Sequence, residues 1–227
     1  MLLLGVAIGL TIPLVLALRK AAGSERSFEV HAAMPPSGPE LANALYQSIG
    51  ARLVPGHAVA LLDNGRVFDA LVEEIERAQH SIHVVMYIWE AGIASDRISA
   101  ALIARARAGV PCRILIDAFG SSAFDETVQP ALVAGGCEVR AFRPLPGPAP
   151  LARNHRKLAI LDGAVAITGG FGIRDNWLGD GAHAESWRDA NVLFSGPAVS
   201  DAQQAFAENW QEAGGALLPP ETLPAPD

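Results

Sequence analysis

Residues 81–116 read SIHVVMYIWEAGIASDRISAALIARARAGVPCRILI and contain two strand-like runs around one helix-like run. Residues 81–89 and 112–116 are rich in β-branched and other apolar residues, which is typical of buried strands. Between them, Asp96 to Ala108 carries apolar residues at helical spacing and is followed by Gly109, a common helix stop. Two buried strands joined by a helix form a βαβ unit, whose strands pair in parallel.

The same alternation extends outward on both sides of this unit. Val67 to Gln79 has helical spacing, and Glu126 to Ala134 predicts a further helix before a strand at Cys137 to Phe142. Val59 to Leu62 predicts a short strand, and Glu40 to Ile49 a short amphipathic helix. We therefore expect an α/β fold with a mainly parallel or mixed sheet and helices on both faces.

The pattern changes after Phe142. Residues 143–150 contain four prolines and predict a loop. Two apolar runs, 157–161 and 164–168, then flank Asp162-Gly163, which is a hairpin signal. A third strand at 191–194 and a helix at 197–213 complete the expected domain.

The N-terminal segment predicts a membrane anchor. Leu2 to Leu18 has no charged residue, and at 1.5 Å per residue it spans roughly 25 Å. Arg19 and Lys20 follow it, so the positive-inside rule places the remaining chain in the cytoplasm. We expect a single-pass protein of the inner membrane, with a cleaved signal peptide as the alternative. The expected organisation is a transmembrane anchor at 1–20, a linker at 21–39, a single α/β domain at 40–218 and a tail at 219–227.

Composition bears on partners and cofactors. The 227 residues carry a formal net charge of −7, which argues against a nucleic-acid partner because phosphate backbones are bound by many Lys and Arg. The two cysteines, Cys112 and Cys137, match no metal-binding or redox spacing. We expect no metal and no other cofactor.

One segment of this acidic chain is basic. Between Glu138 and Asp162 there is no acidic residue, whereas the stretch holds four arginines and Lys157. Such a local charge attracts anions. If a strand begins near residue 156, His155 and Lys157 project to the same side, because side chains alternate along a strand. An imidazole and an ammonium group beside each other are suited to phosphate chemistry, although a solvated basic face is the alternative.

The hairpin adds possible phosphate-binding groups. Thr168 supplies a hydroxyl group, and Gly169-Gly170 can let main-chain N–H groups approach an anion closely.

The longer pattern His155-x-Lys157-x4-Asp162-x6-Gly169-Gly170 resembles the HKD motif of the phospholipase D superfamily. The chain from about Glu40 to Leu218 is similar to the N-terminal half of a bacterial cardiolipin synthase. Further elements that carry this resemblance are Phe68-Asp-Ala-Leu71, His80-Ser-Ile-His83, Asp117 with Gly120-Ser121, Trp187-Arg-Asp189 and Gly196-Pro-Ala-Val199.

The resemblance implies a two-step transfer or cleavage at the phosphodiester of a glycerophospholipid, at a membrane. His155 would attack phosphorus to form a phosphohistidine, and Lys157 would stabilise the developing charge. Asp162 is the third residue of the motif, but its position after the strand favours a role in fixing the hairpin. Asp189 is a candidate for the carboxylate that orients a catalytic imidazole, with a structural hydrogen bond as the alternative.

Two substitutions and one missing motif depart from the family pattern. Gly172 stands where the family usually has Asn, and Asn191 stands where it usually has His. The sequence contains a single His-x-Lys motif, whereas the full pattern needs two. We therefore expect a homodimer or a second HKD half to complete the site. The alternatives are a degenerate half-domain that acts as a partner, or a membrane-tethered dimeric phosphodiesterase or nuclease. The acceptor alcohol stays open between water, glycerol and phosphatidylglycerol.

Overall fold

The computed structural model describes residues 37–121, 123–144 and 152–220. The chain divides into two compact units between Leu53 and Val54. In the first unit, helix α2 spans Gly38–Ile49 and ends at Gly50, whose positive φ of 70° closes the helix. The expected anchor at 1–20 and most of the expected linker and tail lie outside the described residues. Within the described ranges, none of the helices combines the length and the apolar character that a membrane crossing needs.

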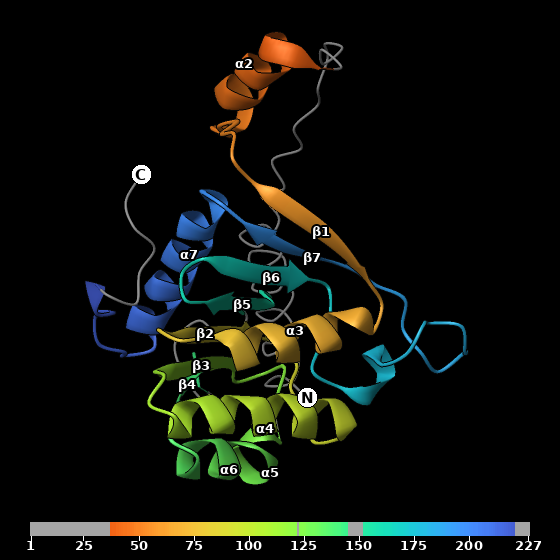
Figure 1. The fold of residues 1–227 in the computed structure, drawn as a ribbon, viewed down its shortest axis with the longest axis vertical. Coiled ribbons are helices and arrows are strands. Elements are labelled where there is room, and N and C mark those ends of the chain that lie inside the picture. Colours follow the sequence, from red (N-terminus) through yellow and green to blue (C-terminus); the bar gives the residue numbers. More distant parts are fainter. Residues whose placement is uncertain (1–36, 122, 145–151, 221–227) are drawn as a thin grey trace, which may run out of the picture. The chain divides into compact units, whose positions relative to one another are not determined.

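The second unit is built on one seven-stranded sheet with the order β1-β7-β6-β5-β2-β3-β4 (Figure 1). The strands are β1 (Ala58–Asp63), β2 (Ile82–Met86), β3 (Cys112–Asp117), β4 (Glu138–Phe142), β5 (Leu158–Leu161), β6 (Val165–Gly169) and β7 (Ala190–Ser195). Only β2, β3 and β4 pair in parallel, and the other four ladders are antiparallel. The sheet is therefore mixed, which is one of the two arrangements that the sequence predicted. The other prediction, a mainly parallel sheet, is wrong.

The predicted hairpin forms one of the antiparallel ladders, between β5 and β6. Asp162 and Gly163 have φ values of 55° and 62°, and the Ala164 N–H donates to the Leu161 carbonyl at 3.0 Å. Positive φ at both central residues is the type I′ geometry that joins antiparallel strands. β5 lies directly beside β2 and runs antiparallel to it, with Val85 opposite Leu158.

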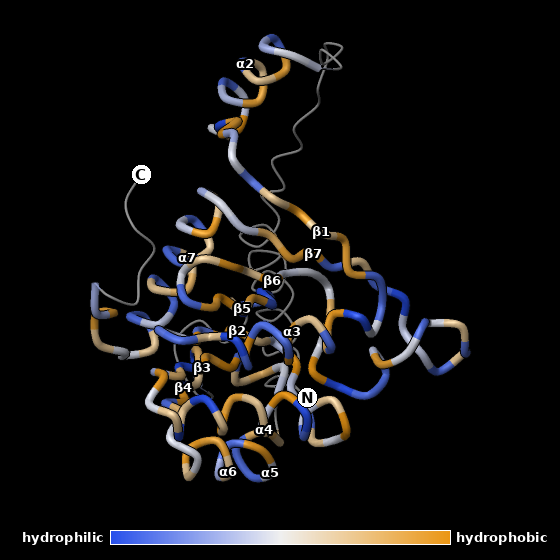
Figure 2. Tube along the Cα trace, viewed as in Figure 1, coloured by the Kyte–Doolittle hydropathy of each residue, from blue (hydrophilic) through white to orange (hydrophobic). Residues whose placement is uncertain are grey.

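Helices cover both faces of the sheet, as expected. Ordered along the chain, they are α3 (Arg66–Arg77), α4 (Ile93–Arg107), α5 (Phe124–Thr127), α6 (Gln129–Ala134) and α7 (Ala198–Glu212), with a 3-10 turn η1 at Asp175–Trp177. One buried cluster lies beneath α3, α4 and α6, and a second lies beneath α7. All five residues of β2 are buried, and Figure 2 shows hydrophobic residues along the inner strands. The single helix expected at 126–134 is two short helices that meet at Val128.

Strand directions bring several chain segments to one edge of the sheet. β2 and β3 end at this edge, β5 begins there, and Leu158 is paired with Thr168 near the end of β6. Gly169 at the end of β6 is in turn paired with Asn191 near the start of β7. The segments just beyond these strand ends, which contain His155, Lys157, Gly170 and Asp189, therefore meet at the same edge.

Candidate functional site

His155 and Lys157 lie together immediately before β5. The Lys157 Nζ atom is 3.0 Å from Nδ1 and 3.1 Å from Nε2 of the His155 ring, and it donates to the His155 carbonyl at 2.8 Å. His155 is exposed, whereas only 4% of Lys157 is. Tyr87, which follows β2, contacts both groups, with its ring centroid 4.5 Å from that of His155 and 5.2 Å from the Lys157 Nζ. The imidazole is thus open to a substrate, with the ammonium group directly behind it.

Asp189 supplies a negative charge to the same place. Burial lowers the pKa of Lys157, and the Asp189 carboxylate opposes this shift by favouring the charged ammonium group. Asp189 Oδ1 accepts the Ala190 N–H at 2.8 Å, while its buried Oδ2 has no hydrogen-bond partner among the described residues. A buried carboxylate oxygen without a partner costs free energy, so it is available to a cation or an N–H donor at this edge.

The glycine pair has a packing role that the sequence did not reveal. A Cβ on Gly169 would collide with the side chain of Asn191, and a Cβ on Gly170 would lie 2.6 Å from Asp189 Oδ1. The two glycines therefore let the start of β7 approach β6 closely. The Thr168 hydroxyl donates to the Lys157 carbonyl at 2.8 Å, so it holds the strand that carries the ammonium group.

Asp162 lies at the opposite end of β5 from His155. Its carboxylate accepts main-chain N–H groups of Gln79, His80 and Ser81 at distances from 2.7 to 3.0 Å. These bonds tie the hairpin turn to the start of β2. The structure thus brings His155, Lys157 and Asp189 to one edge and leaves Asp162 at the other.

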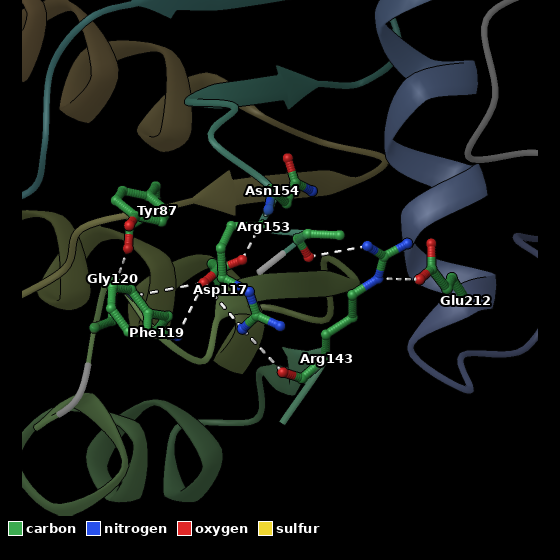
Figure 3. Close-up of polar contacts among 10 residues, drawn as sticks. Tyr87, Asp117, Phe119, Gly120, Arg143, Arg153, Asn154 and Glu212 are labelled. Carbon is green, nitrogen blue, oxygen red and sulfur yellow. Dashed lines mark hydrogen bonds and ion pairs between the residues drawn. The ribbon is translucent and has the colours of Figure 1, made fainter. Parts of the chain in front are cut away.

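Asp117 organises the segment that carries His155, and sequence reasoning gave it no role. Only 1% exposed at the end of β3, it accepts the N–H groups of Phe119 at 2.9 Å and of Asn154 at 2.8 Å. Arg153 Nη1 lies 3.6 Å from the same carboxylate (Figure 3). The bond to Asn154 fixes the main chain one residue before His155. The sequence signal that could have identified Asp117 is an acidic residue at the end of a buried strand, followed by a turn that contains Phe119 and Gly120.

The two departures from the family pattern are both packed inside the domain. A Cβ on Gly172 would lie 3.0 Å from the Cβ of Ile88, so a larger residue there requires a shift of its neighbours. Asn191 is fully buried, and its Nδ2 donates to the Leu62 carbonyl at 3.4 Å. Asn191 therefore joins β7 to β1, and its Oδ1 accepts the Phe171 N–H at 3.4 Å.

Comparison with known proteins agrees with this architecture. The family model "Cardiolipin synthase, PLD-like domain" matches residues 71–210. A cardiolipin synthase of Geobacillus thermodenitrificans is 36% identical over 173 residues, which cover 74% of this chain and 34% of the relative. Cardiolipin synthase 1 of Bacillus anthracis is 33% identical over 162 residues, covering 69% and 32% respectively. The chain belongs to the cardiolipin synthase, PLD-like domain family, and it spans about a third of the length of these curated relatives.

Solved structures share the fold. Nuc from Salmonella typhimurium, a phospholipase D family member, superposes with a TM-score of 0.56 at 18% identity, over 72% of this chain and all of that one. NucT from Helicobacter pylori gives a TM-score of 0.51 at 13% identity, over 69% of this chain and 98% of that one. The phospholipase D-like fold expected from the motif is thereby confirmed.

Proposed function

We propose that this chain provides half of an active site that transfers or cleaves the phosphodiester of a glycerophospholipid through a phosphohistidine at His155. The observation that carries the proposal is the contact between the exposed His155 ring and the ammonium group of the buried Lys157. Family membership supports phospholipase D-type chemistry in general.

In the first step, an imidazole nitrogen of His155 attacks phosphorus and the bond to the leaving alcohol breaks. A histidine from a second motif donates a proton to that alcohol. In the second step, the same histidine removes a proton from the acceptor alcohol or water. The oxygen of the acceptor alcohol or water then attacks phosphorus, the bond from phosphorus to His155 breaks, and His155 is released as a free imidazole. Each step is a displacement at one phosphorus atom, so no oxidant or reductant is involved.

Lys157 stabilises the charge that develops on the non-bridging phosphate oxygens. Burial lowers the pKa of Lys157, and the Asp189 carboxylate opposes this shift by favouring the charged ammonium group. Asp189 is also our candidate for orienting a catalytic imidazole. Gly170 is exposed at the same edge and is our candidate for a main-chain phosphate contact. Thr168 and Gly169 support Lys157 and β7, and Asp162 fixes the hairpin.

The second histidine comes from another copy of this chain or from a separate HKD half. The curated relatives are about three times as long as the matched region, which supports a site built from two such units. We place the reaction at the cytoplasmic side of the inner membrane, where a phospholipid substrate is available. Nucleic acid is the less favoured substrate because the chain carries a net charge of −7.

The test is turnover of phosphatidylglycerol by the full chain in nonionic detergent, with lipid products and released alcohol followed by mass spectrometry. We expect His155→Ala to reduce the rate by roughly a thousandfold or more, because it removes the nucleophile. The matched control is His80→Ala, an exposed histidine at the other end of β2, which should retain the rate. Folded wild-type protein that is as inert as His155→Ala would instead identify the chain as a degenerate half-domain.

A further inference from the structure

The two cysteines of the chain lie side by side where β3 and β4 begin. Arg113 on β3 is paired with Glu138 on β4, so the residues before them, Cys112 and Cys137, are the next pair in this parallel register. Neighbouring strands lie about 4.8 Å apart, and the two Cα atoms of a disulfide are usually about 4.4–6.8 Å apart. The sheet therefore brings two thiols that are distant in the sequence to a separation that a disulfide can span.

Both side chains lie on the same covered face of the sheet. Cys112 is 3% exposed and Cys137 is 4% exposed, and both belong to the buried cluster beneath α3, α4 and α6. Both cysteines are free, and their thiols share a hydrogen bond. This bond requires the two sulfur atoms to face each other, so the directions of the side chains also fit a disulfide.

The shared hydrogen bond makes the two thiols chemically different. Because Cys112 donates this bond, the bond raises the pKa of Cys112 strongly, and burial adds to the shift. The same bond lowers the pKa of Cys137, and burial opposes that shift. The thiolate is the nucleophilic form of cysteine, so Cys137 is the residue that reacts first with an oxidant. Cys112 is then placed to resolve the oxidised product.

Cys137 also lies beside the part of the sheet that opens most readily. β4 is the last strand in the sheet order and has β3 as its neighbour (Figure 1). The turn before Cys137 is Gly135-Gly136, and Gly136 adopts a positive φ of 101°. Edge strands and their turns open locally at a lower free energy than the centre of a sheet does. A small, uncharged oxidant can therefore reach the pair without global unfolding.

We propose that Cys112 and Cys137 form a reversible disulfide, which clamps β4 to β3 when the protein meets hydrogen peroxide. The Cys137 thiolate attacks one peroxide oxygen, the O–O bond breaks, and a sulfenic acid and hydroxide form. The Cys112 sulfur loses its proton and attacks the sulfenic sulfur, whose S–O bond breaks. The two thiols are thus oxidised to a disulfide, and the peroxide is reduced to two water molecules. In a reducing compartment such a pair is reduced at rest and is oxidised transiently.

The disulfide stabilises the fold at the end remote from the candidate site. Cys112 begins β3, whereas Asp117 ends it and accepts the N–H of Asn154 beside His155. A bond between residues 112 and 137 closes a loop in the unfolded chain and so lowers the conformational entropy of that state. The clamp is independent of the proposed function, because it changes stability and requires no turnover.

Peptide mapping tests whether the bond forms in the folded protein. The full chain in nonionic detergent is treated briefly with hydrogen peroxide, its remaining thiols are alkylated, and tryptic peptides are analysed by mass spectrometry without reduction. We expect the peptide that contains Cys112 to be joined to the peptide that contains Cys137, and dithiothreitol should separate them. Folded protein that yields only free thiols or cysteine oxyacids, without the linked peptides, overturns the proposal.

Urea unfolding tests the clamp. Peroxide should raise the unfolding midpoint of wild type by roughly 1 M or more, and dithiothreitol should reverse the rise. Cys112→Ala and Cys137→Ala each remove one thiol and should show no rise. The matched control is Val110→Ala, which truncates another buried side chain next to the start of β3 and keeps both thiols, so its midpoint should rise as in wild type. Linked protein with an unchanged midpoint, or an equal rise in the single-cysteine variants, contradicts the clamp.

Discussion

The two ends of strand β5 are fixed by the same chemistry and serve different purposes. At one end, Asp162 accepts three main-chain N–H groups and joins the hairpin turn to β2. At the other, Asp117 accepts N–H groups from the turn after β3 and from Asn154. Asp162 belongs to the motif that the sequence predicted and lies at the opposite end of β5 from His155. Asp117 lies outside that motif and accepts the N–H of Asn154, the residue before His155. Position in the fold therefore decides the role of a carboxylate better than membership of a motif does.

Removing the charge at Asp117 is expected to have the largest effect. Asp117→Asn weakens its contact with Arg153 and replaces an acceptor-only group by one that also donates. We expect a loss of about 2–4 kcal/mol in the free energy of unfolding, because the site is buried. Phospholipid turnover per folded molecule should also fall roughly 10- to 100-fold as the His155 segment loses its anchor. Urea unfolding and lipid turnover measure the two effects. Full turnover in the folded fraction would show that Asp117, like Asp162, affects stability alone.

Asp162→Asn is expected to affect stability alone. Its carboxylate accepts several main-chain N–H groups, and an amide side chain satisfies fewer of them. We expect the free energy of unfolding to fall by about 1–3 kcal/mol, with turnover per folded molecule within about twofold of wild type. The same urea and turnover measurements apply. A turnover loss as large as that of Asp117→Asn would assign Asp162 to the chemistry.

A buried histidine makes the sheet sensitive to acid. Burial lowers the pKa of His83 to about 4, with Arg113 adding to the shift and the hydrogen bond to Gln203 opposing it. The unfolded chain therefore takes up this proton near pH 6.5, before the folded protein does. Stability contributed by neutral His83 is complete above that pH and is lost as the pH falls toward 4. We expect a loss of about 2–3 kcal/mol between pH 7.5 and 4.5.

His83→Gln tests that assignment, with His80→Gln as the matched control because His80 is exposed on the same segment. The urea-unfolding midpoint of His83→Gln should fall less between the two pH values than that of the control. Equal falls in both variants would place the acid sensitivity elsewhere in the chain.

A substitution in the glycine pair is expected to affect stability about as much as Asp162→Asn does. Gly169→Ala places a Cβ against Asn191 and should cost about 1–3 kcal/mol in the free energy of unfolding. Combining it with Asn191→Ala should cost less than the sum of the two single changes, because the second truncation removes the clash. Additive losses in thermal or urea unfolding would contradict the packing role of Gly169 and favour the phosphate-binding role that the sequence predicted.

Local pattern predicted the parts of this molecule that depend on neighbouring residues. The βαβ unit around residues 81–116 and the Asp162-Gly163 turn follow from spacing of a few residues. His155 and Lys157 contact each other, but both precede β5, which begins at Leu158, so strand alternation is not the reason for the contact. The contacts between segments that are distant in the sequence could not be predicted from local pattern. The placement of β5 beside β2, the hold of Asp117 on Asn154 and the packing of Asn191 against Gly169 each join residues more than 20 positions apart. Such pairings are fixed by the sheet order.

The central claim is that the Asp117 end of β5 carries the nucleophile. The most direct measurement is mass spectrometry of rapidly quenched, peptide-digested protein after mixing the full chain with short-chain phosphatidylglycerol. We predict a phosphatidyl adduct on the peptide that contains His155, present in Asp162→Asn and absent in His155→Ala. Turnover of the lipid without any adduct at His155, or with an adduct on another histidine, would contradict the account.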